Sequence, residues 1–106
     1  MNNKELLELA AKAAGVEGTW KCNSASGYSG IDVNDPDSIY WNPLEDDGDA
    51  FRLAVKLNLS LSQSPFQDAQ VQGDYGSCIE AHDGDPYAAT RLAIVRAAAD
   101  IGKTMV

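Results

Sequence analysis

Apolar residues recur every three or four positions along residues 4–14, and again near the C-terminal end, which predicts an amphipathic helix in each place. Asn3 is placed to cap the first helix and Gly15 to end it. An aspartate followed by Pro86 is typical of a helix start, and Gly102 is typical of a helix end. The many alanines of this last helix indicate close packing against another surface.

Residues 41–57 are the most strongly patterned stretch of the chain. They run from an aromatic residue through an Asn-Pro turn and an acidic helix start into apolar positions at helical spacing. Asn42 and Glu45 have the form of a capping box, but Asp46 or Asp47 can cap a helix that starts later, and we favour the later start. We expect the helix to end near Leu57 or Asn58. The apolar positions form one ridge, made of Phe51, Ala54, Val55 and Leu59.

Alternation of apolar and polar residues predicts five short strands. Two precede the central helix, at residues 18–22 and 38–41, and the stretch between them is rich in turn-forming residues. Three follow it, at residues 59–62, 69–72 and 78–82, and their short links imply an antiparallel meander. The predicted class is α+β, with the order α-β-β-α-β-β-β-α in a single domain spanning the 106 residues.

The placement of charge is unusual. A net charge of −8 argues against binding to a nucleic-acid backbone, because that affinity comes mainly from Lys and Arg. Seven acidic residues and no basic one lie between Lys21 and Arg52, and five more acidic residues lie between Lys56 and Arg91. Apart from Lys21, the basic residues fall in or just after predicted helices. The sequence therefore predicts separate acidic and basic regions on the folded surface.

The sequence gives little support for membrane insertion, metal binding or a cofactor. No apolar run approaches the ~20 residues that cross a bilayer, and the first residues lack a signal-peptide pattern, so we expect a cytoplasmic protein. Cys22 and Cys78 are expected to be reduced thiols. A single histidine cannot form a multi-histidine metal site, and residues 32–37 lack the glycine and closing glutamate of a calcium loop. No metal and no cofactor are expected.

Catalysis is also not expected. His82 has Glu80, Asp83 and Asp85 near it in sequence, but no nucleophile is placed beside it. The chain has no GxSxG, P-loop or HExxH motif. Acidic pairs in the central stretch are explained more simply as charges at a helix start than as acid–base partners. We therefore expect a protein that is not an enzyme.

Two segments carry a family resemblance. Residues 41–57, WNPLEDDGDAFRLAVKL, and residues 85–102, DPYAATRLAIVRAAADIG, resemble the phage ABA-sandwich domain of small tailed-phage and prophage proteins. Residues 6–15 resemble that family's first helix, whereas residues 24–37 match no part of it. The resemblance implies a three-layer α/β/α sandwich with a mainly antiparallel sheet, in agreement with the element count. It implies no catalytic residues.

The resemblance and the residue types together predict a non-enzymatic phage accessory protein in the host cytoplasm. Its expected role is counter-defence, by binding and sequestering a small nucleotide-like signal at a homo-oligomer interface. Aromatic residues outside the helices can stack on a base, and arginine near a helix start can meet a phosphate. The candidate ligand-binding residues are Tyr40, Trp41, Asn42, Arg52, Tyr87 and Arg91. Alternatively, Trp41 only packs against the central helix and Trp20 fills the core.

A second hypothesis is an inhibitor that binds a basic host protein through its acidic tracts, in the manner of a nucleic-acid mimic. The candidate residues for such a surface are Asp32, Asp35, Asp37, Asp46, Asp47 and Asp49. Most acidic surfaces are only solvated, which is the simpler explanation of these residues. No membrane partner is expected under either hypothesis.

Overall fold

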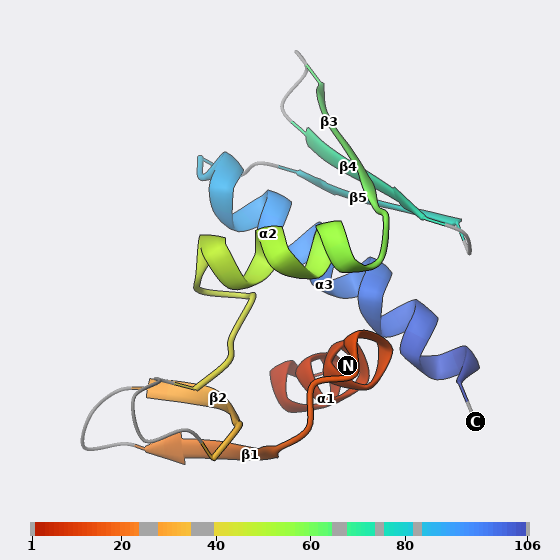
Figure 1. Ribbon diagram of the computed structural model, residues 1–106. Helices are drawn as coiled ribbons and strands as arrows, with labels where there is room; N and C mark the ends of the chain where they lie inside the picture. Colours follow the sequence, from red (N-terminus) through yellow and green to blue (C-terminus); the bar gives the residue numbers. More distant parts are fainter. Residues whose placement is uncertain are drawn as a thin grey trace.

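The computed structural model describes residues 2–23, 28–34, 40–64, 68–73, 76–81 and 84–105. Its three helices are α1 (Asn3–Ala14), α2 (Asp47–Lys56) and α3 (Pro86–Thr104). Its five strands are β1 (Thr19–Asn23), β2 (Tyr28–Asp32), β3 (Ser60–Ser64), β4 (Asp68–Gly73) and β5 (Gly76–Ala81). The α+β class and the predicted order of elements are confirmed (Figure 1).

The strands form two antiparallel sheets, with orders β1-β2 and β3-β4-β5. The predicted meander is confirmed: β3 and β5 flank β4, with Leu61 opposite Val71 and Val71 opposite Cys78. The layering differs from a single sheet held between helices. Helices α2 and α3 lie next to the three-stranded sheet, α1 lies beyond them, and the β1-β2 hairpin closes the opposite side (Figure 1).

Helix α3 is the centre of the fold, because it packs against α1, α2, β4 and β5. Its alanines allow this close approach on several sides, and Ala93, Val95 and Ala98 are fully buried. Gly102 does not end the helix as expected, since α3 continues to Thr104. Gly102 lies instead where α3 crosses α1: a Cβ atom added there would lie 2.1 Å from the carbonyl oxygen of Leu9.

Helix α1 begins one residue earlier than expected. Asn2 rather than Asn3 is the cap, because its side chain accepts a hydrogen bond of 2.8 Å from the Glu5 N–H. Gly15 ends the helix as predicted, at a φ of 72° that favours glycine. The side chain of Lys12 donates to the carbonyl of Met105, which joins α1 to the end of α3.

The first sheet is placed differently from the prediction. Strand β2 lies within the stretch expected to be a turn-rich loop. Of the strand expected at residues 38–41, residues 38 and 39 lie outside the described part, and Trp41 makes only an isolated bridge to Ile31. Gly30 explains this arrangement, because a Cβ atom there would lie 2.5 Å from the Trp41 carbonyl oxygen. Gly30 thus serves close backbone approach rather than a turn.

Helix α2 starts and ends where the sequence indicates. Asp46 caps it by accepting a 2.7 Å hydrogen bond from the Asp49 N–H. At the other end Asn58 has a φ of 55°, and the Leu59 N–H donates to the Ala54 carbonyl at 2.9 Å, which closes the helix as a Schellman motif. Among the described residues, no helix is both long enough and apolar enough to span a membrane.

Candidate functional site

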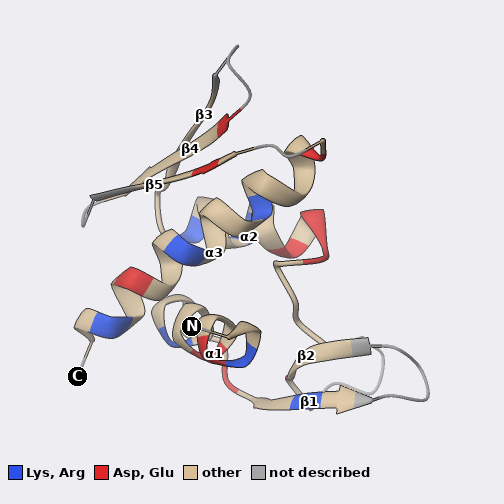
Figure 2. Cartoon of the chain, turned by 180° about the vertical axis from the view of Figure 1, so that it is seen from behind, with Lys and Arg blue, Asp and Glu red and all other residues tan. Residues whose placement is uncertain are grey.

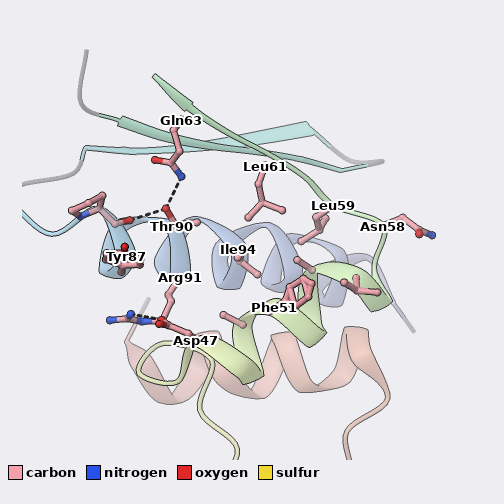
Figure 3. A pocket seen from close by; sticks show the side chains of 14 residues that line it. Asp47, Phe51, Asn58, Leu59, Leu61, Gln63, Tyr87, Thr90, Arg91 and Ile94 are labelled. Carbon is pink, nitrogen blue, oxygen red and sulfur yellow. Dashed lines mark hydrogen bonds and ion pairs between the residues drawn. The ribbon is translucent and has the colours of Figure 1, made fainter. Parts of the chain in front are cut away.

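A groove of about 1060 Å³ lies between α2, β3 and the first half of α3 (Figure 3). Phe51 and Val55 line it from α2, Leu61 from β3, and Tyr87 from α3. Ile94 forms part of its base. Its other lining residues are Asp47, Ala50, Ala54, Asn58, Leu59, Gln63, Pro86, Thr90 and Arg91.

The groove is apolar and open to solvent. Phe51 is 63% exposed, Val55 61%, Leu61 46% and Tyr87 70%. Within the described part of the chain these four make up most of the exposed large hydrophobic residues, the others being Ile79 and Met105. Single exposed apolar side chains are ordinary, but a contiguous group marks a binding surface. This grouping is the main reason for regarding the groove as the candidate site.

Helix α2 has two apolar faces, which explains why the groove exists. Ala50, Leu53 and Ala54 are buried in the core, so the ridge that contains Phe51 and Val55 turns towards the groove. The predicted ridge is therefore present, but Phe51 and Val55 on it are exposed rather than packed in the core. The spacing of four between Phe51 and Val55 was the sequence signal for this ridge. That spacing does not show which of the two apolar faces of α2 is covered by α3.

Strand β3 forms the upper wall. Helix α3 packs under β4 and β5, so the inward side of β3 overhangs the groove. One hydrogen bond of 2.8 Å, from the Gln63 side-chain amide to the Thr90 hydroxyl, joins β3 to α3. Thr90 in turn donates to the Pro86 carbonyl at 2.7 Å. These contacts tie β3 to the first turn of α3 at one end of the groove.

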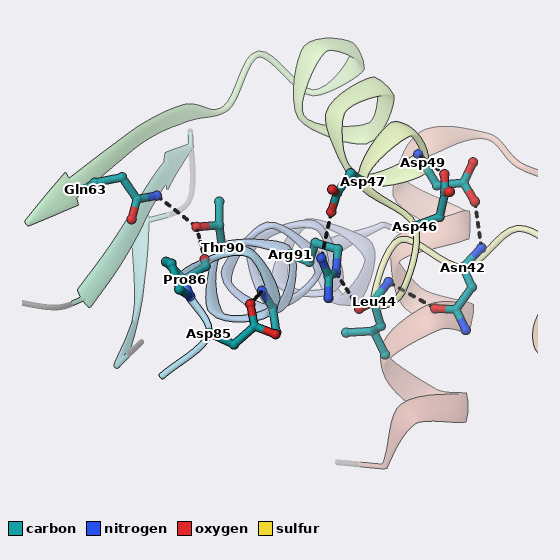
Figure 4. Close-up of polar contacts among 11 residues, drawn as sticks. Asn42, Leu44, Asp46, Asp47, Asp49, Gln63, Asp85, Pro86, Thr90 and Arg91 are labelled. Carbon is teal, nitrogen blue, oxygen red and sulfur yellow. Dashed lines mark hydrogen bonds and ion pairs between the residues drawn. The ribbon is translucent and has the colours of Figure 1, made fainter. Parts of the chain in front are cut away.

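Arg91 forms the polar rim of the groove (Figure 4). Its Nε donates to the Leu44 carbonyl at 2.9 Å, and its Nη1 lies 2.6 Å from Asp47 Oδ1. The Arg91 side chain is only 18% exposed, whereas that of Asp47 is 70% exposed. Two of the five N–H groups of the guanidinium are used in these two bonds. Arg91 therefore joins the start of α2 to α3 and presents a cation beside the apolar lining.

A second polar network surrounds Asn42, which is 7% exposed. Its side chain donates to the Ser29 carbonyl at 2.9 Å and accepts from the Leu44 N–H at 3.0 Å. Its own N–H donates to Asp49, and Asp49 also accepts from Arg52 at 2.7 Å. Asn42 is thus a structural residue that fixes the approach to α2.

The six predicted ligand-binding residues divide into three pairs. Tyr87 and Arg91 line the groove together. Asn42 and Arg52 belong to the network around Asp49, outside the groove. Trp41 is partly buried against the core, as is Trp20, which agrees with the simpler packing explanation of these side chains. Tyr40 is half-buried and is not among the residues that line the groove.

The expected separation of acidic and basic regions does not hold in space. Arg91 pairs with Asp47, and Arg96 forms an ion pair with Glu80 (Figure 2 shows the charges on the chain). Arg52 contacts Asp49 at 2.7 Å and Asp46 at 3.9 Å. Basic residues on the helices thus meet acidic residues from the tracts that contain no base. The prediction was wrong because residues distant in sequence are neighbours in the fold.

The candidates for an acidic binding surface have structural roles where the structure describes them. Asp46 caps α2, Asp47 and Asp49 are in ion pairs, and Asp32 accepts a 2.8 Å hydrogen bond from the Asn34 N–H. The other two candidates, Asp35 and Asp37, lie outside the described residues, as does His82.

The two cysteines are free thiols in different environments. Cys22 is exposed, whereas Cys78 is half-buried on the face of β5 that meets α3. Burial raises the pKa of the Cys78 thiol, and Asp100, whose carboxylate lies 3.7 Å from the sulfur, raises it further. A neutral thiol is a weak nucleophile, so Cys78 is suited to packing rather than to reaction.

Comparison of the chain with protein-family models, with curated proteins and with solved structures finds no match. The resemblance to the phage ABA-sandwich domain therefore stays a prediction.

Proposed function

We propose that the protein acts by binding rather than by catalysis, and that its binding site is the groove between α2, β3 and α3. The observation that carries this proposal is the grouping of Phe51, Val55, Leu61 and Tyr87, all largely exposed, around one groove. Leaving such a surface in water is unfavourable, at roughly 25 cal/mol for each Å² of apolar area. Covering it with a ligand would recover that free energy.

The chemistry of the groove favours a ligand with a planar apolar group and an anionic end. Phe51 and Tyr87 offer aromatic surface for stacking, and the Arg91 guanidinium at the rim can receive a phosphate. A small nucleotide-like molecule has both features. In the phage setting that the sequence resembles, the protein would sequester such a signal in the host cytoplasm and so counter host defence.

Asp47 sets a condition on this proposal. Its carboxylate is paired with Arg91 and would repel an incoming phosphate, so the anion must replace Asp47 as the partner of the guanidinium. Removing the charge of Asp47 should therefore strengthen the binding of a phosphate-bearing ligand. It should leave the binding of the corresponding uncharged nucleoside unchanged.

The alternative, an inhibitor of a basic host protein, has less support. Asp46, Asp47 and Asp49 already neutralise arginines of the same chain, which weakens the field that would attract a basic partner.

The test is a thermal-shift screen with cyclic nucleotides and ADP-ribose-type nucleotides, followed by calorimetric titration of any compound that raises the Tm. Phe51→Ala and Tyr87→Ala should each weaken binding by about tenfold or more, because each removes aromatic contact worth ~1–3 kcal/mol. Asp47→Asn should tighten the binding of phosphate-bearing compounds. The proposal also requires that a bound compound is recovered chemically unchanged.

Ile79→Ala is the matched control. Ile79 is 58% exposed, much like the groove residues, but it does not line the groove. Its replacement should leave binding unchanged. A screen in which no nucleotide raises the Tm would overturn the assignment of ligand class, and equal losses in the Ile79 and Phe51 variants would overturn the assignment of the site.

A further inference from the structure

Among the residues that the structure describes, strand β3 is an edge strand of its sheet. Within the described residues it pairs with β4 alone, and Ser60, Ser62 and Gln63 on it are exposed. The edge of a sheet offers backbone N–H and C=O groups to another strand. Natural proteins usually protect such an edge with charged residues, proline or a covering element. No residue of β3 is charged and none is proline.

The other edge of the same sheet is protected. Strand β5 carries Glu80, whose carboxylate is paired with Arg96 of α3. The sulfur of Cys78 on the same strand lies 3.7 Å from Asp100. Strand β5 thus carries a carboxylate and has charged neighbours from α3, whereas no residue of β3 is charged. Strand β3 is therefore the edge at which two copies of this acidic chain can meet without opposing carboxylates.

Strand β3 is also self-complementary. Two copies of one strand pair antiparallel about a two-fold axis, and residues directly opposite each other then lie on the same face. Leu61 of both copies would thus lie on the helix side of the joined sheet. The exposed Phe51 of α2 lies below β3 on that same side (Figure 3), and Val55 lines the same groove. Strand pairing therefore also brings the two grooves side by side.

We propose that two copies of the chain associate through β3, so that two three-stranded sheets join into one continuous sheet and the two grooves open onto each other across the axis. This interface brings Leu61, Phe51 and Val55 of the two copies together around one shared groove. It gives the predicted homo-oligomer a defined contact, and it does not depend on the existence of a small ligand.

The test measures the mass of the full chain in solution by sedimentation equilibrium over a wide range of concentration. The wild type should reach twice the chain mass. Ser62→Lys, in the middle of β3, should weaken the dimer by about tenfold or more, because the two-fold axis brings the two new charges close together. Ser62 does not line the groove, so ligand binding by this variant is measured separately.

Gln72→Lys is the control, because it adds the same charge to an exposed position of the central strand β4. It should leave the dimer intact, and circular dichroism of both variants checks that each is folded. A wild type that remains monomeric at all concentrations overturns the proposal. So does a dimer that Ser62→Lys and Gln72→Lys affect equally. Loss of the dimer with retained nucleotide binding separates this inference from the proposed function.

Discussion

Gly102→Ala tests the close contact between α1 and α3. The new Cβ atom would lie 2.1 Å from the Leu9 carbonyl oxygen and 2.8 Å from its carbonyl carbon, both of them backbone atoms of α1. Contacts of Cβ atoms below 3.0 Å are essentially never found, so α1 and α3 must move apart by about 1 Å at this point. No rotation of a side chain can relieve the overlap.

The expected magnitude follows from two opposing effects. Alanine in a helix is favoured over glycine by up to ~1 kcal/mol, which by itself would stabilise α3. Overpacking in a tightly packed core costs ~1–3 kcal/mol, and a rigid backbone neighbour places this case at the upper end. We expect a net loss of about 2 kcal/mol in the free energy of unfolding, which corresponds to a Tm lower by about 10 °C.

The assay is urea unfolding at one fixed protein concentration, since association would shift the midpoint. Gly48→Ala is the matched control. The nearest atoms to a Cβ at Gly48 belong to the side chains of Arg52 and Asp46, at 3.2 to 3.3 Å, and these can move. Its unfolding free energy should stay within about 0.5 kcal/mol of the wild type. The reasoning is refuted if Gly102→Ala is as stable as Gly48→Ala.

Three further predictions concern single side chains. Arg91→Met should lower the free energy of unfolding by about 1–3 kcal/mol, because it leaves the part-buried Leu44 carbonyl without its donor. Asp47→Asn should lower it by less than about 1 kcal/mol, because the Asp47 side chain is mostly exposed. Urea unfolding of the two variants compares these losses. Asn58→Gly should be neutral or slightly stabilising at its φ of 55°, and Asn58→Val should destabilise by about 1 kcal/mol or more, as thermal unfolding can show. Because the pKa of the Cys78 thiol is raised in the folded protein, the unfolded chain loses this proton at a lower pH than the folded chain does. The contribution of Cys78 therefore makes the free energy of unfolding fall as the pH rises past the ordinary thiol pKa of 9.0. In the folded protein, iodoacetamide should modify the exposed Cys22 before Cys78.

The order of the elements could be predicted because each element is specified by local signals. Asp46 and Asp85 are capping residues directly before their helices, and Gly15 permits the backbone conformation that ends α1. Such signals act within a few residues and do not depend on the rest of the fold. The same holds for the alternation that predicts the three-stranded meander.

The site could be predicted only in part, because its residues are brought together by packing between distant elements. Tyr87 and Arg91, two of the predicted ligand-binding residues, line the groove together because they lie one turn apart on α3. The contribution of Phe51 was not foreseen, since helix periodicity does not say which apolar face is covered. Arg52 was expected to bind a ligand, but its guanidinium donates a hydrogen bond to Asp49, three residues away. Gly30 was interpreted as a turn residue, although the segment that approaches it, around Trp41, lies far along the chain.

The packing of α1 against α3 has a consequence for the way the protein is made. The face of α1 that carries Leu6, Leu7 and Ala10 is buried largely by a helix that begins at Pro86. During synthesis this face leaves the ribosome several seconds before its partner, at rates of ~5–20 residues per second. The apolar face of α1 stays exposed to water on the nascent chain during that interval. Ribosome-associated chaperones that shield nascent apolar segments should therefore crosslink to residues 6–14 until α3 has emerged.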